Sequence, residues 1–120
     1  MTSELQLAML IGQAAAEEHA VDVRILELTP LTVIADYFVI CGGRSSIQLR
    51  SICDNIELYT EDSGVKPLRR EGYEEAKWIV LDYGSVIVHM FLPEQREYYR
   101  LENLWSDAVE LLPEAAPPEA

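Results

Sequence analysis

The sequence predicts a mixed α/β domain in which a single mixed β-sheet is flanked by helices. Two kinds of apolar spacing alternate along the chain: a period of three to four residues, typical of helices, and short alternating or continuous runs, typical of strands. They occur in the order helix, strand, strand, helix, short strand, hairpin, helix, without an internal repeat or linker. One sheet with helices packed against it is the simplest architecture for that order.

The first third of the chain predicts one helix and two strands. Ser3 and Gln6 have the spacing of a capping box, and small or apolar residues then recur at helical spacing, which indicates an amphipathic helix over residues 3–19. Valine and isoleucine alternate with polar residues over 21–28, as in a half-buried strand. The continuous apolar run 37–41 ends at two glycines and indicates a buried central strand.

The middle of the chain predicts a long helix followed by an edge strand. Ser45 and Gln48 repeat the capping-box spacing, and the apolar stripe of the helix that they open continues until Gly64. Residues 65–69 contain a proline and are therefore expected to form only a short strand at the edge of the sheet.

The last third predicts a hairpin and a helix. Two apolar runs, 78–82 and 86–91, flank a Tyr-Gly-Ser turn and indicate a β-hairpin. Pro93 can begin a last helix. Its apolar face is expected to carry Tyr98, Leu101, Leu104, Trp105 and Ala108. We expect one domain over residues 1–112 and a disordered acidic tail, rich in proline and alanine, over residues 113–120.

The chain is strongly acidic: 21 aspartate and glutamate residues against nine lysines and arginines give a formal net charge of -12. This balance argues against direct DNA binding, because a nucleic-acid binder needs a positive surface that displaces counterions. Acidity keeps a protein soluble. It also complements a basic protein partner, whose encounter it would accelerate. Charge alone leaves both interpretations open.

The sequence carries no signal for a zinc site, a membrane span or secretion, and we expect a cytoplasmic protein. Cys41 and Cys53 lack the paired spacing of a zinc site, and both are expected to be small buried hydrophobic groups. No apolar stretch approaches the roughly 18 residues that a membrane span needs. The acidic N-terminus resembles neither a secretory signal nor a transit peptide.

Two features are candidate sites of chemistry. Residues 42–46, Gly-Gly-Arg-Ser-Ser, lead from a strand into a helix, where an anion can bind. They lack the lysine of the Walker motif and the third glycine of the dinucleotide motif, so a turn with a serine cap is the simpler interpretation. Asp82 is the only carboxylate in the hairpin strands, and Gly84 occupies the next position on its face. Asp36 could approach it from the neighbouring strand, but we expect no metal and no cofactor.

His89 lies in an apolar strand, where a hydrogen-bonded packing role is commoner than catalysis. No serine, cysteine or second acid is recognisably paired with it, so no nucleophilic triad is indicated. We expect no enzymatic activity.

Three segments resemble signatures of the ribosomal silencing factor (RsfS, or Iojap) family. The first is residues 35–40, Ala-Asp-Tyr-Phe-Val-Ile, followed by a glycine and then Ser45, Ser46 and Gln48. The second is Glu71 and Gly72 followed by residues 78–84 and 86–91. The third comprises Arg96, Tyr98, Tyr99, Leu101, Glu102, Leu104 and Trp105. The sequence departs from the pattern at Ser85, where the family usually has an acid, and residues 73–77 fall in a variable stretch.

The resemblance implies a fold related to that of nucleotidyltransferases but without their catalytic acids. It also implies a partner, the large ribosomal subunit, bound through its protein number fourteen at the face that would meet the small subunit. Occupying that face would block subunit joining sterically and repress translation under nutrient limitation. The protein would function as a monomer, and a homodimer of the free protein stays open.

The candidate contacts to the ribosomal protein combine an aromatic anchor, an apolar patch across the hairpin, and acids that could face basic residues. They are Glu71, Glu74, Glu75, Trp78, Asp82, Tyr83, His89 and Met90. Trp78 could instead pack in the core, and the acids could simply be solvated. The sequence does not fix which hairpin face is exposed. Two other functions stay open: a nucleotidyltransferase-like enzyme with a nucleotide at residues 42–46, and a structural adaptor whose hairpin pairs with itself.

Overall fold

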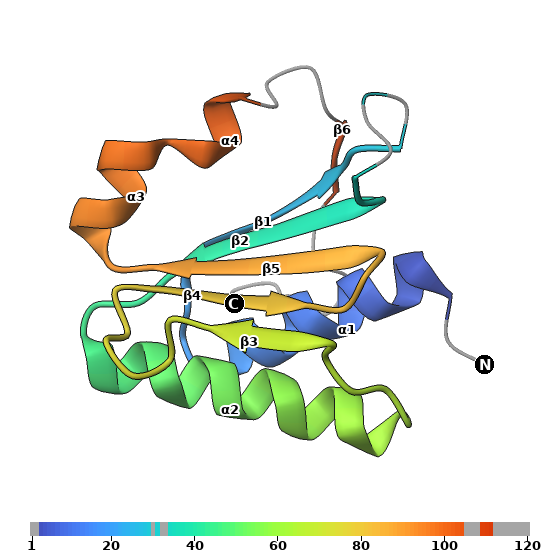
Figure 1. Ribbon diagram of the computed structural model, residues 1–120, viewed down its shortest axis with the longest axis horizontal. Helices are drawn as coiled ribbons and strands as arrows, with labels where there is room; N and C mark the ends of the chain where they lie inside the picture. Colours follow the sequence, from blue (N-terminus) through green and yellow to red (C-terminus); the bar gives the residue numbers. More distant parts are fainter. Residues whose placement is uncertain (1–2, 30, 32–33, 105–108, 112–120) are drawn as a thin grey trace, which may run out of the picture.

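The structure is a computed structural model that describes residues 3–29, 31, 34–104 and 109–111. One six-stranded sheet has helices on both sides (Figure 1). The helices are α1 (Glu4–Glu17), α2 (Ser46–Asp62), α3 (Pro93–Tyr99) and α4 (Leu101–Leu104). The strands are β1 (Val21–Glu27), β2 (Tyr37–Gly42), β3 (Arg69–Glu71), β4 (Trp78–Asp82), β5 (Val86–Phe91) and β6 (Val109–Leu111). The predicted single mixed sheet with flanking helices is confirmed.

The sheet has the strand order β3-β4-β5-β2-β1-β6. The central pair, β2 and β5, is parallel, and every other pair is antiparallel. β2 thereby joins the N-terminal half of the chain to the β4–β5 hairpin. The hairpin turns at Gly84, whose φ of +89° explains the glycine between the two apolar runs.

Both serine caps form as predicted. Ser3 and Gln6 make a complete capping box. Ser45 accepts the backbone N–H of Gln48 at 3.1 Å, but the Gln48 side chain does not close a second box. Its Oε1 accepts the N–H of Arg44 at 2.6 Å, and its Nε2 donates to two carbonyls at the end of α1. Gln48 therefore ties the start of α2 to the end of α1.

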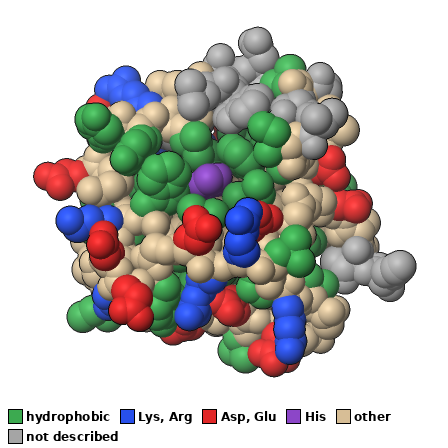
Figure 2. Space-filling view, viewed as in Figure 1, with side chains coloured by type: hydrophobic (Ala, Val, Ile, Leu, Met, Phe, Trp, Pro, Cys, Tyr) green, Lys and Arg blue, Asp and Glu red, His purple; other side chains and the backbone are tan. Residues whose placement is uncertain are grey.

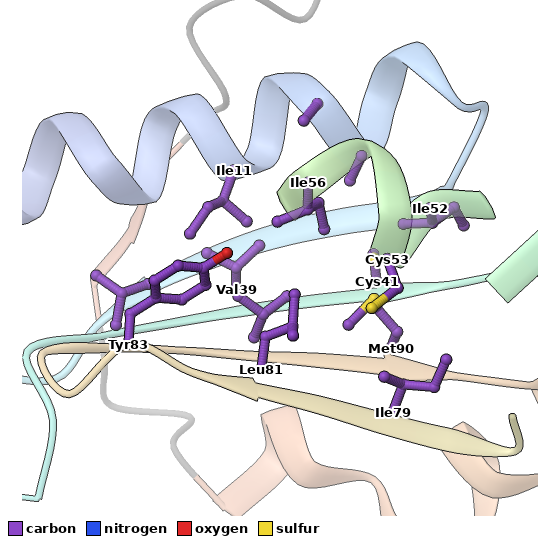
Figure 3. Close-up of a cluster of buried hydrophobic side chains, with 14 of the residues drawn as sticks. Ile11, Val39, Cys41, Ile52, Cys53, Ile56, Ile79, Leu81, Tyr83 and Met90 are labelled. Atoms are coloured by element: carbon purple, nitrogen blue, oxygen red, sulfur yellow. The ribbon is translucent and has the colours of Figure 1, made fainter. Parts of the chain in front are cut away.

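The larger core lies between the sheet and the two long helices, α1 and α2 (Figure 3). Ile11, Val39, Ile52, Ile56, Ile79, Leu81 and Met90 are fully buried there. Cys41 and Cys53 are also fully buried, as predicted. Burial raises the pKa of the Cys41 thiol to about 12, so this cysteine is a neutral packing group at physiological pH.

A smaller core occupies the opposite face of the sheet. It consists of Leu26, Leu28, Ala35, Phe38, Ile40 and Phe91. Three partly buried side chains pack against it: Trp78, Ile87 and Leu101. Leu101 comes from α4, so the short C-terminal helices cover part of this face. Among the described residues, no helix combines the length and apolarity that crossing a bilayer requires.

Two predicted elements differ from the structure. The edge strand is Arg69–Glu71 instead of residues 65–69. Val65 still donates its N–H to Thr60 at the end of α2, and Pro67 has no N–H to donate. The prediction of a single last helix is wrong as well. Arg100 adopts a left-handed conformation (φ 44°) that separates α3 from α4.

The break at Arg100 also changes the expected helix face. Tyr98 is 80% exposed and does not lie on a buried stripe. Trp105, Ala108 and the tail 113–120 lie outside the described residues. β6, which pairs with β1, was not predicted, because a run of only three residues carries little periodic signal.

The tight packing of the segment before β4 can be tested by substituting Gly72 in that segment and Gly64 in an open turn. Gly72 and Gly64 have nearly equal φ angles, +80° and +81°. A Cβ at Gly72 would lie 2.1 Å from the carbonyl oxygen of Trp78, whereas a Cβ at Gly64 would meet nothing within 4 Å. We expect Gly64→Ala to lower the free energy of unfolding by roughly 1–2 kcal/mol, the cost of a left-handed L-residue. Gly72→Ala should lower it clearly further, and equal denaturant midpoints for the two variants would contradict this packing.

Candidate partner-binding face

Alternation along β4 and β5 sends neighbouring side chains to opposite faces of the sheet. Side chains of the first set point toward α1 and α2 and are buried: Ile79, Leu81, Val86, Val88 and Met90. The second set points away from those helices and forms what we call the open face: Trp78, Val80, Asp82, Ile87, His89 and Phe91. In Figure 2, hydrophobic side chains gather around a histidine, and charged side chains border them.

Two predicted contact residues are not on the open face. Met90 is fully buried, and Tyr83 is 8% exposed, both within the core beneath α1 and α2. The Tyr83 hydroxyl hydrogen-bonds to Thr60 at 2.9 Å, and burial raises the pKa of Tyr83 to about 12. The prediction that Tyr83 and Met90 extend an exposed apolar patch is therefore wrong.

Trp78 and His89 form a hydrogen-bonded pair at the centre of the open face. The indole Nε1 of Trp78 donates to Nδ1 of His89 at 3.1 Å, which places the imidazole proton on Nε2. His89 is 8% exposed, and its Nε2 is buried without a hydrogen-bond partner among the described residues. Desolvation lowers the pKa of His89 to about 4, so the ring is neutral at pH 7. The predicted hydrogen-bonded packing role of His89 is confirmed.

Trp78 packs against neighbouring rings and also keeps part of its surface exposed. Its ring packs against Tyr99 of α3, with centroids 4.6 Å apart, and against Phe91, with centroids 4.9 Å apart. The side chain is nevertheless only half-buried. A large aromatic surface that is already fixed on one side loses little entropy when a partner covers the other.

Charged residues border the apolar centre on the side of β3. Glu71 lies opposite Val80 and is exposed. Asp82 forms an ion pair with Arg69 at 3.2 Å and accepts the Gly84 N–H at 2.8 Å. The Asp82 carboxylate thus stabilises the hairpin turn and the contact between β4 and β3. No group of three metal-ligating side chains occurs within the described ranges.

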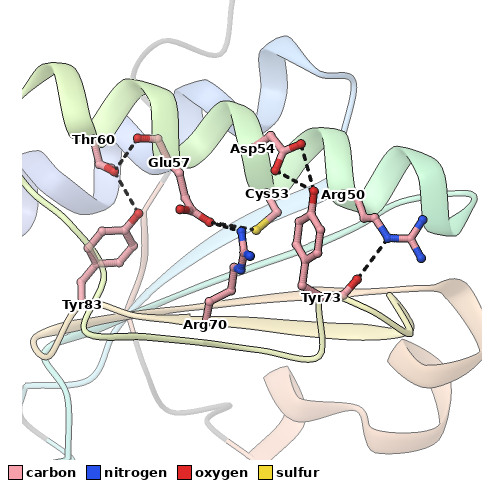
Figure 4. A network of polar contacts seen from close by, with 8 residues as sticks. All are labelled: Arg50, Cys53, Asp54, Glu57, Thr60, Arg70, Tyr73 and Tyr83. Atoms are coloured by element: carbon pink, nitrogen blue, oxygen red, sulfur yellow. Dashed lines mark hydrogen bonds and ion pairs between the residues drawn. The ribbon is translucent and has the colours of Figure 1, made fainter.

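The acidic loop before β4 is held by polar contacts with α2 (Figure 4). Arg50 donates from Nε to the carbonyl of Tyr73 at 3.1 Å and from Nη2 to the carbonyl of Glu74 at 2.7 Å. The Tyr73 hydroxyl donates to Asp54 at 2.9 Å. The side chains of Glu74 and Glu75 are exposed. The loop therefore presents two acids to solvent from a held backbone, and Glu75 lies beside Trp78.

The predicted anion turn lies beside a cavity of about 480 Å³. Gly42 and Gly43 line it together with Arg96 and Arg100 from the C-terminal helices. Arg96 pairs with Asp22 at 3.4 Å, and Arg100 pairs with Glu97. Each of these guanidinium groups faces a carboxylate that also lines the cavity, so the described lining gives no excess of positive charge for a phosphate.

A family model described as "Ribosomal silencing factor during starvation" matches residues 2–120. The chain belongs to the ribosomal silencing factor family. The resemblance carried by the three sequence signatures is thereby confirmed.

Curated members of this family are similar over most of the chain. The Bacillus subtilis ribosomal silencing factor RsfS is 34% identical over 106 residues, covering 88% of this chain and 90% of that protein. The Halalkalibacterium halodurans RsfS is 38% identical over 106 residues, covering 88% of this chain and 91% of that protein. A mouse relative named "Mitochondrial assembly of ribosomal large subunit protein 1" is 34% identical over 96 residues, 75% of this chain and 41% of that protein.

Solved structures support the same family fold. A crystal structure of a Chromobacterium violaceum protein has a TM-score of 0.85 and 27% identity, covering 88% of each chain. The sheet and helices described above are thus the architecture of the silencing-factor family.

The structure adds residues to the open face that sequence reasoning missed. Val80 and Ile87 are partly exposed there, and Tyr99 covers one side of Trp78. Alternation within the predicted hairpin could have found Val80 and Ile87. The position of Tyr99 depends on how α3 returns over the sheet, which no local pattern specifies.

The Trp78–His89 pair generates a prediction about acid stability. The pKa of His89 lies near 4 when folded and 6.5 when unfolded, so the unfolded chain binds more protons between these values. Stability is therefore retained above pH 6.5 and falls as the pH drops toward 4. At pH 5 the loss relative to pH 7 should be roughly 2 kcal/mol, at 1.36 kcal/mol for each pKa unit.

The check is the denaturant midpoint of the wild type and of His89→Gln at pH 7 and pH 5. Glutamine keeps an acceptor for the Trp78 indole but does not titrate. We expect the wild type to lose more stability than the variant over this interval. Identical losses would show that His89 does not titrate as a desolvated group.

Proposed function

We propose that this chain binds the large ribosomal subunit through its open face and sterically blocks joining with the small subunit, in the cytoplasm and as a monomer. The contact within the large subunit would be its protein number fourteen, and the outcome would be repressed translation under nutrient limitation. Membership of the silencing-factor family supports a ribosomal target. The name of the mouse relative points to the large subunit.

The observation that carries this proposal is the composition of the open face. An apolar centre with a half-buried tryptophan is bordered by acids, on a chain with a net charge of -12. Apolar anchors supply most of the energy of a protein interface, whereas complementary charge selects the partner and speeds encounter. A basic ribosomal protein fits both features.

Steric exclusion requires no reaction. The folded chain measures 35 × 32 × 32 Å. Surfaces that join through direct contacts must approach to within a few ångströms, since hydrogen bonds span roughly 3 Å. A body of this size on the joining face of the large subunit therefore prevents the small subunit from making those contacts.

The first test is co-sedimentation with purified large and small subunits. The protein should pellet with large subunits and should lower the fraction of joined ribosomes when small subunits are added. Val80→Lys places a cation in the apolar centre, opposite Glu71, and should weaken binding at least tenfold, because the charge would have to be desolvated and would repel a basic partner. Leu58→Lys is the matched control, since Leu58 is 55% exposed on α2, away from the open face.

Equal binding by these two variants would overturn the assignment of the open face. Pelleting with small subunits alone would overturn the proposed target itself. Denaturant midpoints of both variants should stay close to that of the wild type, which shows that lost binding is not lost folding.

A second test separates the electrostatic acceleration of encounter by the acids from the apolar contacts that hold the complex. Glu74→Lys combined with Glu75→Lys should slow association with large subunits and reduce its salt dependence, because charges at the rim of an interface act mainly on the on-rate. Glu61→Lys combined with Asp62→Lys makes the same change in net charge at two exposed acids near the end of α2. Stopped-flow association rates at two ionic strengths should fall more for the first pair, and equal effects would mean that only net charge matters.

A further inference from the structure

A hollow of about 220 Å³ lies beside Trp78, between the loop that precedes β4 and α3. The described residues that line it are Gly72, Glu75, Lys77, Trp78, Gln95 and Tyr99. Trp78 also belongs to the open face, so the hollow opens next to the apolar centre of that face. Gln95 and Tyr99 have no part in the contacts discussed so far, except that Tyr99 packs on Trp78.

The walls of the hollow combine two aromatic rings with oxygen acceptors. The rings of Trp78 and Tyr99 have centroids 4.6 Å apart and are tilted by 46°. Oε1 of Gln95 is buried and has no hydrogen-bond partner among the described residues. Glu75 adds an exposed carboxylate at the rim. Because this oxygen is closed off from solvent, a ligand reaches it when the Gln95 amide rotates toward the hollow, and an N–H group supplied there would relieve the cost of a buried acceptor without a donor.

We propose that this hollow binds an arginine side chain of the protein partner. A guanidinium group is planar, stacks on aromatic faces and carries five N–H donors, so it can contact the rings, Gln95 and Glu75 together. An apolar side chain would leave the Gln95 oxygen unpaired. The proposal rests on the docking face proposed above and assigns the chemistry of one contact within it.

The chain already contains one example of this recognition. The guanidinium carbon of Arg70 lies 4.0 Å from the centroid of the Tyr73 ring, while Arg70 also binds the carboxylate of Glu57 at 3.1 Å. Within this chain, an aromatic ring and a carboxylate oxygen thus bind the same arginine. The hollow offers the same two kinds of group with no arginine of the described chain between them.

The loop wall of the hollow is held in place before a ligand arrives. Arg50 holds the backbone of the acidic loop, and the N–H of Leu92 donates to the carbonyl of Lys77 at 3.0 Å. A rigid site loses less entropy on binding than a mobile one. Lys77 is the basic residue of the described lining, and its exposed ammonium opposes a cationic ligand.

The first experiment needs no ribosome. N-acetyl-arginine amide is titrated into ¹⁵N-labelled protein while the Trp78 indole and Gln95 side-chain amide signals are followed by NMR. N-acetyl-citrulline amide, which has nearly the same shape but no charge, is the matched probe. We expect saturable shifts centred on the hollow with the arginine probe and at least about tenfold weaker binding of citrulline, because a charged donor forms the stronger hydrogen bond.

Variants then test the walls. Gln95→Leu and Tyr99→Leu should each weaken the arginine probe severalfold, whereas Gln13→Leu should not, since Gln13 lies on α1 and does not line the hollow. Lys77→Gln should strengthen binding. Equal shifts for arginine and citrulline, or shifts spread over other parts of the protein, would overturn the proposal.

Large subunits provide the second experiment. Gln95→Glu adds a carboxylate to the hollow and should slow dissociation, while Gln95→Leu should accelerate it. If the wild type does not bind large subunits, the proposed function fails, although the probe titration can still succeed. If the wild type binds but neither Gln95 variant changes the dissociation rate, the arginine contact fails and the proposed function remains.

Discussion

The register of the β4–β5 hairpin is the constraint on which the two faces of the molecule depend. Trp78 pairs with Phe91, and Val80 pairs with His89. Because the side-chain period of a strand is two, a slip by one residue would send the open-face side chains under the helices and expose the buried set. The core beneath α1 and α2 resists that slip, since Ile79 and the residues that share its face are fully buried there.

The unequal covering of the sheet follows from this register. Two long helices close one face, whereas α3 and α4 reach only part of the other. Among the described residues, α3 and α4 leave the apolar centre of the open face uncovered. The Trp78–His89 hydrogen bond and the contact of Trp78 with Tyr99 hold this centre rigid. A rigid apolar surface gains free energy when a partner removes it from water, and it loses little conformational entropy in doing so.

Local patterns in the sequence predicted most of the fold. Ser3 and Ser45 cap their helices and Gly84 turns the hairpin, because caps and turns depend on a few adjacent residues. Features that depend on tertiary contacts were missed, including the break at Arg100 and the pairing of β6 with β1. At the candidate site, the predicted contacts combined Trp78 and His89 with Tyr83 and Met90, although the two strands have two faces. Strict alternation of side chains already assigns His89 and Met90 to opposite faces, so this part of the error was avoidable from the sequence.

The two layers of the molecule are joined at the edge where binding is proposed. The acidic loop places Glu75 beside Trp78, yet its backbone is held by Arg50 and its Tyr73 hydroxyl by Asp54, both residues of α2 on the other side of the sheet. α2 is in turn packed in the core and tied to the end of α1 by Gln48, which donates to the carbonyls of Glu18 and His19. The geometry of the acidic border is thus set by helices that a partner on the open face would not touch. Its charges can act on encounter without the loop having to order itself, which keeps steering and anchoring physically separate.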